Sequence, residues 1–216
     1  MSGLFSGINL MELLYRIPAI VVALSFHEWA HAYSAYRLGD PTARNLGRMT
    51  LNPLSHIDPI GFIMLILVRF GWARPVPINP RNFKNQRRDE SIVSLAGVFV
   101  NLLLAFVTMG IAYVLSYFNV TNVALDTIIY YFYFINIGLL VFNLLPIPPL
   151  DGYHVFQNLL IRVVGPKPFL FLDRYGQFVL LGLLLTGALT GLLSVVVEWI
   201  ASGMAWVYNN LIFFWM

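Results

Sequence analysis

Long stretches without a single basic residue divide the lysines and arginines of this 216-residue chain into clusters. Nine of the 13 Lys and Arg residues fall between residues 37 and 88, and none occurs in 89–161 or after 174. Basic loops that alternate with uncharged apolar stretches are the positive-inside pattern of a polytopic membrane protein. The formal charge of +3 therefore does not indicate a nucleic-acid partner, which would need a soluble basic surface.

The composition supports the same conclusion. Hydrophobic residues make up 59% of the chain and charged residues 11%, whereas soluble domains carry about 25% charged residues. A chain this apolar is not expected to fold in water. We expect one integral-membrane domain over residues 1–216, built as an all-α helical bundle of about five to six membrane segments with a small re-entrant or β-hairpin-like insertion.

The lengths of the apolar stretches set the expected helices, because about 20 apolar residues are needed to span a hydrocarbon core of about 30 Å. We expect helices over residues 16–38, 91–118, 127–145 and 151–164. Prolines at 146–149 separate the last two. The remainder, 175–216, is expected to be one long span or a span followed by an apolar hairpin, with Glu198 and Gly203 as candidate breaks.

Residues 60–72 form an apolar stretch that is too short to span comfortably, and Arg69 interrupts it. Basic residues on both of its flanks favour a re-entrant or interfacial segment that returns to the same side. The flanking stretches 48–52 and 74–80 are expected to form short strands, the second at an edge because proline is tolerated there.

The strongest chemical signal is HEWAH at residues 27–31. On a helix, His27 and His31 lie one turn apart and Glu28 projects into the same sector. Two such imidazoles can bind one zinc ion, and the neighbouring carboxylate can act as general base. Ionisable groups inside a membrane helix are costly and usually functional. The alternative is a polar cluster that bridges helices or relays protons in a transporter.

A zinc site needs a third protein ligand and an open position for water. The chain has no cysteine, so imidazole and carboxylate groups are the available ligands, and the other histidines are His56 and His154. Asp151 is the better candidate because it follows a proline-broken helix, and non-helical backbone at membrane depth normally lines a cavity or is buried in protein. Asp151 could also serve as a helix N-cap, and both roles can hold together.

These two motifs together resemble the site-2 protease family of intramembrane metallopeptidases. That family pairs an HExxH helix with a distant Leu-Asp-Gly, found here in NLLPIPPLDG at 143–152. Two further stretches, NPLSHIDPIG at 52–61 and GVFVN at 97–101, resemble stretches of the compact members of this family. Compact members lack a PDZ or nucleotide-sensing domain. The resemblance implies one zinc per chain and proteolysis of a transmembrane or membrane-near segment, with Glu28 activating the water.

Four more polar residues are candidates for the site. Asn101 and Asn143 lie in apolar stretches, where an amide could hold an extended substrate, stabilise an oxyanion or join helices. His56 and Asp58 could orient a metal ligand from behind. A proline-flanked polar turn explains the second pair equally well.

The expected partners are a transmembrane protein substrate and membrane lipid, and the sequence does not indicate an oligomeric state. Loop 119–126 has no Lys or Arg and is placed outside. We therefore expect a protein of the cell (inner) membrane with its active site towards the cytoplasm. Two other functions remain open: a membrane zinc hydrolase acting on another substrate class, and a transporter or scaffold that uses the polar cluster structurally.

Overall fold

The computed structural model describes residues 10–68 and 71–212. Eight α-helices form within these residues, together with short 3₁₀ turns at Pro53–Ser55 and Pro80–Asn82 and a π-helical turn at Tyr208–Ile212. The helices are α1 (Leu10–Arg37), α2 (Thr42–Asn45), α3 (Pro59–Val68), α4 (Gln86–Tyr117), α5 (Val123–Asn143), α6 (Asp151–Val164), α7 (Lys167–Leu185) and α8 (Thr190–Val207).

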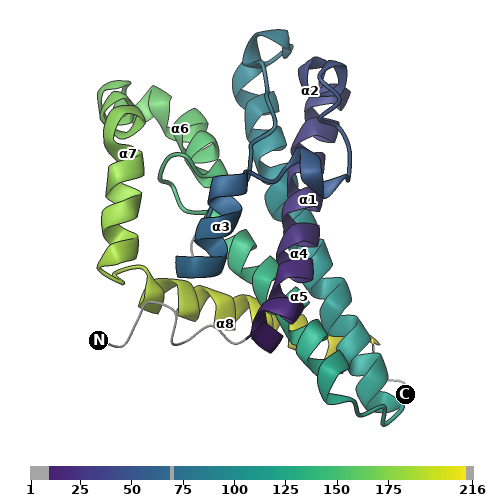
Figure 1. Cartoon of the computed structure of the whole chain (residues 1–216). Helices are drawn as coiled ribbons and strands as arrows, with labels where there is room; N and C mark the ends of the chain where they lie inside the picture. Colours follow the sequence, from purple (N-terminus) through teal and green to yellow (C-terminus); the bar gives the residue numbers. More distant parts are fainter. Residues whose placement is uncertain (1–9, 69–70, 213–216) are drawn as a thin grey trace.

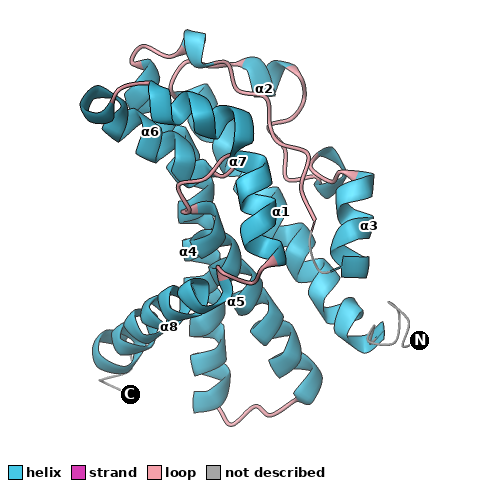
Figure 2. Ribbon diagram, turned by 90° about the vertical axis from the view of Figure 1, so that its left-hand side faces the viewer, coloured by secondary structure: helices cyan, strands magenta, loops and turns pink. Residues whose placement is uncertain are grey.

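Three long helices form the centre of the molecule. α1, α4 and α5 pack against one another (Figure 1), and a short loop joins α4 to α5 as a helical hairpin (Figure 2). Ala105 of α4 and Ile137 and Leu140 of α5 are buried in one hydrophobic cluster between the two helices. Met204 of α8 belongs to the same cluster. α8 itself runs across the other helices (Figure 1).

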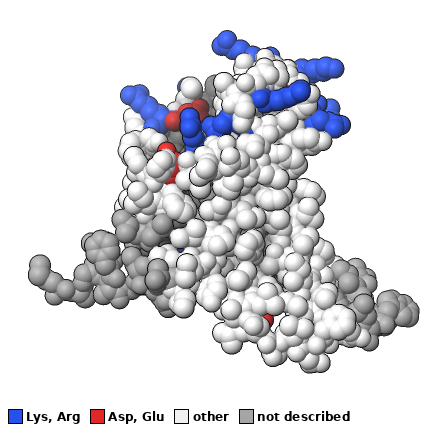
Figure 3. Space-filling model, turned by 45° about the vertical axis from the view of Figure 1, so that its right-hand side comes forward, with Lys and Arg blue, Asp and Glu red and all other residues white. Residues whose placement is uncertain are grey.

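Four helices of the described chain are long and apolar enough to cross a membrane: α4, α5, α7 and the stretch Thr190–Asn210 that contains α8. α1, which carries the HEWAH residues, is not among the four. Its 28 residues nevertheless measure about 42 Å, which is longer than a hydrocarbon core of about 30 Å. In the view of Figure 3 the lysines and arginines gather at one end of the molecule. The expected all-α, polytopic membrane fold is confirmed.

α3 occupies the stretch that was expected to re-enter. Its ten residues measure about 15 Å, roughly half a hydrocarbon core. The chain before and after α3 meets: Ile57 pairs with Ala73 in an isolated antiparallel bridge, and the Arg74 N–H donates to the His56 carbonyl at 2.8 Å. The chain that follows α3 therefore lies beside the residues that precede it. Arg69 lies outside the described residues.

The strands predicted at 48–52 and 74–80 are wrong, since neither stretch forms a strand in the structure. The prolines of 74–80 have no N–H to offer a neighbouring strand. The carbonyls are bonded by a side chain instead, because the Arg48 guanidinium donates to the Arg74 carbonyl at 2.8 Å. The insertion is an extended segment held by side chains and a single bridge, not a β-hairpin.

The prediction for the C-terminal part is corrected in two places. α7 begins at Lys167, eight residues before the C-terminal stretch that was expected to start at 175, and the following break falls at 186–189. Gly187 adopts a left-handed φ of 69° there, a conformation that glycine takes without strain. Glu198 and Gly203, the expected breaks, both lie inside α8. A lone glycine is tolerated inside a helix.

Candidate metal centre

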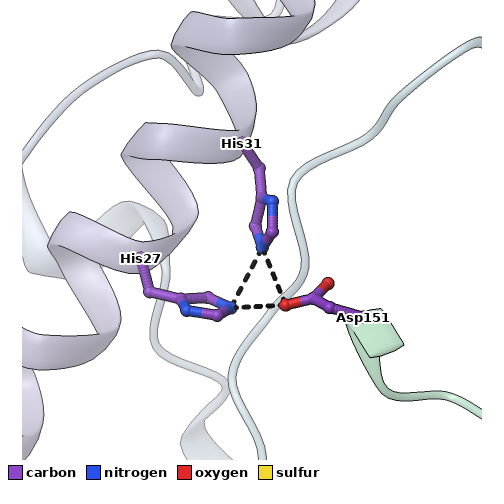
Figure 4. Close-up of side chains that lie close together, drawn as sticks. All are labelled: His27, His31 and Asp151. Carbon is purple, nitrogen blue, oxygen red and sulfur yellow. Dashed lines mark hydrogen bonds and ion pairs between the residues drawn. The ribbon is translucent and has the colours of Figure 1, made fainter. Parts of the chain in front are cut away.

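Two histidines of α1 and the aspartate that begins α6 converge on one point (Figure 4). The Nε2 atoms of His27 and His31 lie 3.0 Å apart. Asp151 Oδ2 lies 3.1 Å from the first and 3.3 Å from the second. The structure thus brings the three predicted metal ligands together, from two helices separated by more than 100 residues of sequence.

The triangle has the size and chemistry that zinc requires. Ligand atoms about 2.1 Å from a tetrahedral zinc lie roughly 3.4 Å from one another, close to the three separations observed. Asp151 Oδ2 is buried and has no hydrogen-bond donor among the described residues. Three acceptor atoms that face one another at this distance repel unless a cation lies among them. The residues present therefore fit one zinc ion.

The other nitrogen of each imidazole is bonded away from the triangle. His31 Nδ1 lies 2.8 Å from the backbone carbonyl of Val93, which can only accept, so Nδ1 carries the proton. His27 Nδ1 lies 2.6 Å from Oδ1 of Asn101, which also accepts. Both bonds leave Nε2 as the unprotonated nitrogen, and a metal-binding histidine requires such an orientation.

Gly97 allows α4 to lie directly against these rings. A Cβ atom at position 97 would sit 2.5 Å from His31 Nε2 and 2.7 Å from His27 Cε1, closer than atoms can approach. The first glycine of GVFVN is therefore a space requirement of the metal centre. The surface that Gly97 packs against is the histidine pair.

Gly97→Ala should weaken zinc binding, because the added methyl group must push both imidazoles out of position. We expect a loss of zinc affinity of about 10–100-fold, comparable to that of disturbing an outer partner of a ligand. Zinc content after dialysis against a graded chelator measures it. Gly138→Ala is the matched control, since its Cβ would have no neighbour within 4 Å in the part of the chain that the structure describes. Wild-type affinity in Gly97→Ala would show that the close approach is irrelevant.

Glu28 is buried beside the two histidines and is bonded to the extended segment. Its Oε2 accepts a hydrogen bond of 2.8 Å from the backbone N–H of Val76. Val76 packs its side chain onto Ala32 of α1 and Ala43 of α2. The general-base candidate is therefore positioned by main chain, and the segment that carries Val76 is attached to α1.

Asp40 holds the far end of the same segment. The buried carboxylate accepts from the Asn79 N–H at 2.7 Å, from the Asn82 amide at 2.6 Å and from Thr42. Burial works to raise the pKa of this carboxyl, but the bonds from Thr42, Asn79 and Asn82 outweigh burial and hold the pKa below its usual value. Asp40 therefore stays ionised and keeps accepting these bonds at neutral pH.

α7 supports the loop that leads to Asp151. A Cβ atom on Gly176 would lie 2.6 Å from Pro148 Cδ, so α7 packs closely on the proline-rich turn. Two residues after Asp151, the buried Tyr153 hydroxyl donates to the Asp173 carboxylate of α7. Both contacts fix the start of α6, and thereby the direction of its first carboxylate.

The other predicted residues take different places. Asn101 lies behind His27, with its side chain engaged on both sides. Asn143 donates to a carbonyl of its own helix at 3.1 Å. His56 is buried and bonds a loop carbonyl at 2.7 Å, and Asp58 accepts from an N–H at the start of α3 at 2.8 Å. Each of the last three bonds joins residues no more than six positions apart in the sequence.

Sequence reasoning missed one polar residue near the centre, Asn136 of α5, which is fully buried and bonds to Asn101 at 3.0 Å. The signal was available, because Asn136 is an amide in an apolar helix, as Asn101 and Asn143 are. Asn136 lies outside the motifs that carry the family resemblance, so those motifs do not single it out.

Comparison with known proteins agrees with this geometry. The sequence profile of peptidase family M50 matches residues 118–187, which include Asp151. A Bacillus subtilis (strain 168) protein named "Putative zinc metalloprotease YwhC" is 40% identical over 188 residues, which cover 85% of this chain and 84% of that protein. The chain belongs to peptidase family M50.

Two M50 relatives from mycobacteria, both named "Putative zinc metalloprotease Rip2", support the same assignment. The protein of Mycolicibacterium smegmatis is 31% identical over 191 residues, and that of Mycobacterium tuberculosis (strain H37Rv) is 32% identical over 190. Each comparison covers 85% of this chain and 71% of the relative. No solved structure matches the chain. The resemblance to the site-2 protease family is confirmed, and this M50 chain is an integral-membrane zinc metalloprotease.

Proposed function

We propose that the chain cleaves peptide bonds in or near transmembrane segments of substrate proteins, as an intramembrane zinc metalloprotease with Glu28 as general base. The observation that carries this proposal is the place of the three-ligand group. His27 and His31 are buried on α1, which packs against α4 and α5, two helices apolar enough to span a membrane. A metal held there faces substrates that lie within the bilayer.

His27, His31 and Asp151 would hold the zinc ion, which would supply activation of a water molecule and polarisation of the carbonyl of the scissile bond. Glu28 takes the proton of the attacking water and passes it to the leaving amine. Its carboxylate does not belong to the ligand group formed within the described residues, which leaves it available for proton transfer. Since the Val76 N–H holds Oε2, Oε1 is the oxygen that moves the proton.

An apolar groove supports a substrate of low polarity. It has a volume of about 560 Å³ and lies between α1, α3 and α5. Leu24 of α1, one turn before His27, lines it together with Phe62 of α3 and Leu139 of α5. A lining of this kind suits apolar side chains of a membrane segment.

The substrate class is tested with the purified protein in lipid vesicles. Radiolabelled membrane-spanning peptides should be cut, and cutting should stop with a zinc chelator and resume with added zinc. Phospholipids and small acyl amides, presented in the same vesicles, should stay intact. Zinc-dependent breakdown of those compounds, with the peptides left intact, would favour a membrane zinc hydrolase of another substrate class. A protein without zinc or turnover would favour the transporter or scaffold.

The proposal also places the metal centre near the cytoplasmic face of the cell membrane. Arg37 lies six residues beyond His31, about 9 Å along α1, and the basic residues gather at one end of the molecule (Figure 3). Single cysteines at the exposed positions Leu54, Lys84 and Thr121 test this, because the native chain has none. An impermeant thiol reagent added outside cells should label only position 121. Labelling at 54 or 84 would contradict the orientation.

A further inference from the structure

A continuous chain of buried amides connects the ligand His27 to α5. Asn101 Oδ1 lies 2.6 Å from His27 Nδ1. The Asn101 amide nitrogen donates to Asn136 Oδ1 at 3.0 Å, and the Asn136 amide nitrogen donates to the Phe132 carbonyl at 2.8 Å. Both asparagines have no exposed surface. The chain crosses three helices, α1, α4 and α5.

The direction of every bond in this chain follows from its last member. The Phe132 carbonyl can only accept, so Asn136 must present its nitrogen to Phe132 and its oxygen to Asn101. Asn101 then donates its nitrogen to that oxygen and presents its own oxygen to His27. The His27 proton is held on Nδ1 as a result, and Nε2 keeps the lone pair that faces His31 and Asp151 (Figure 4).

We propose that Asn136 is a positioning residue of the metal centre, which fixes the tautomer and orientation of the His27 imidazole through Asn101. This inference rests on the proposed ligands His27, His31 and Asp151. Without Asn136, the Asn101 amide loses the acceptor that orients it and can turn its nitrogen towards His27. A donor facing His27 Nδ1 would move the imidazole proton to Nε2, where it blocks metal binding.

A purely structural role, as an amide that joins two membrane helices, makes a different prediction. Loss of such a contact would lower stability and leave the metal site unchanged. Ile137 is the matched control for this role, because it is the next residue on α5, is also fully buried and belongs to the core cluster. Ile137→Ala should lower the melting temperature and keep wild-type metal binding.

The test uses Co²⁺ as the probe, with the full-length protein in detergent. Absorption in the visible range reports the geometry around cobalt, and competition with a chelator gives its dissociation constant. Asn136→Leu should raise that constant about tenfold, the lower end of the usual cost of losing an outer partner, and alter the spectrum. Asn136→Asp should stay near wild type, because burial favours the protonated carboxyl, whose O–H donates to the Phe132 carbonyl while its other oxygen accepts from Asn101. Asn136→Ala carries the test if the leucine variant does not fold.

Wild-type affinity and spectrum in Asn136→Leu or Asn136→Ala would overturn the proposal. Equal weakening in Ile137→Ala would also overturn it, since packing alone would then explain the loss. Failure of the metal centre itself gives a distinct result, in which the unaltered protein binds no cobalt, and the proposal falls with it. The proposal is supported if Asn136→Leu or Asn136→Ala binds cobalt weakly while Asn136→Asp and Ile137→Ala bind it as the unaltered protein does.

Discussion

Alanine at both His27 and His31 should leave the purified protein without zinc. The two imidazoles supply two of the three ligands, and Asp151 alone cannot hold the ion against a chelator. We expect zinc affinity to fall by more than about 100-fold, since loss of a mere outer partner already costs about 10–100-fold. Elemental analysis of zinc per chain measures the effect, with one zinc expected in the unaltered protein. Asp151→Ala should show the same loss.

His154→Ala is the control for this experiment. His154 lies on α6 like Asp151, but it is part-exposed and faces Glu90 at 3.5 Å, outside the ligand group. Its replacement should leave zinc content unchanged. Full zinc occupancy in the double histidine variant would place the metal elsewhere and remove the basis of the proposed site.

Glu28→Gln should keep its zinc and lose its activity. Glutamine has nearly the shape of glutamate, and its oxygen can still accept the bond from the Val76 N–H. It cannot take up a proton, so turnover should fall by a factor of roughly 10²–10⁴, the range typical of acid–base catalysis. Zinc analysis and peptide cleavage are measured on the same preparation.

The control is the partner of the general base. Val76→Ala keeps the N–H that bonds to Glu28 and removes only side-chain packing, so it should lose far less turnover than Glu28→Gln. Two results would refute the assignment of Glu28. A glutamine variant without zinc would make Glu28 a ligand, and one with full activity would remove it from the reaction.

The membrane fold and the candidate ligand group were predictable from the sequence because both depend on local patterns. The spacing of His27 and His31 places them on one face of any helix, and Asp151 is marked by the proline-broken helix before it. The partners of these residues were not predictable. Gly97 and Asn136 act through packing between α1, α4 and α5. A single sequence does not show which faces of these helices are in contact.

The errors have physical causes as well. The segment 74–80 has the prolines of an edge strand, but its backbone groups bond to the side chains of Arg48, Asp40 and Glu28, so no ladder forms. Glu198 and Gly203 were expected to interrupt a helix, and both are accommodated inside α8. The break falls instead at 186–189, where Gly187 takes the left-handed conformation.

The position of the cut in a reconstituted substrate tests the central claim most directly. A peptide with one apolar span is placed in vesicles with the purified protein, and mass spectrometry identifies the new termini. The account predicts a single region of cleavage, within the apolar span or at its cytoplasmic-side border, that appears with zinc and is absent in Glu28→Gln. Cleavage confined to the soluble tails, or products that persist in the glutamine variant, would contradict it.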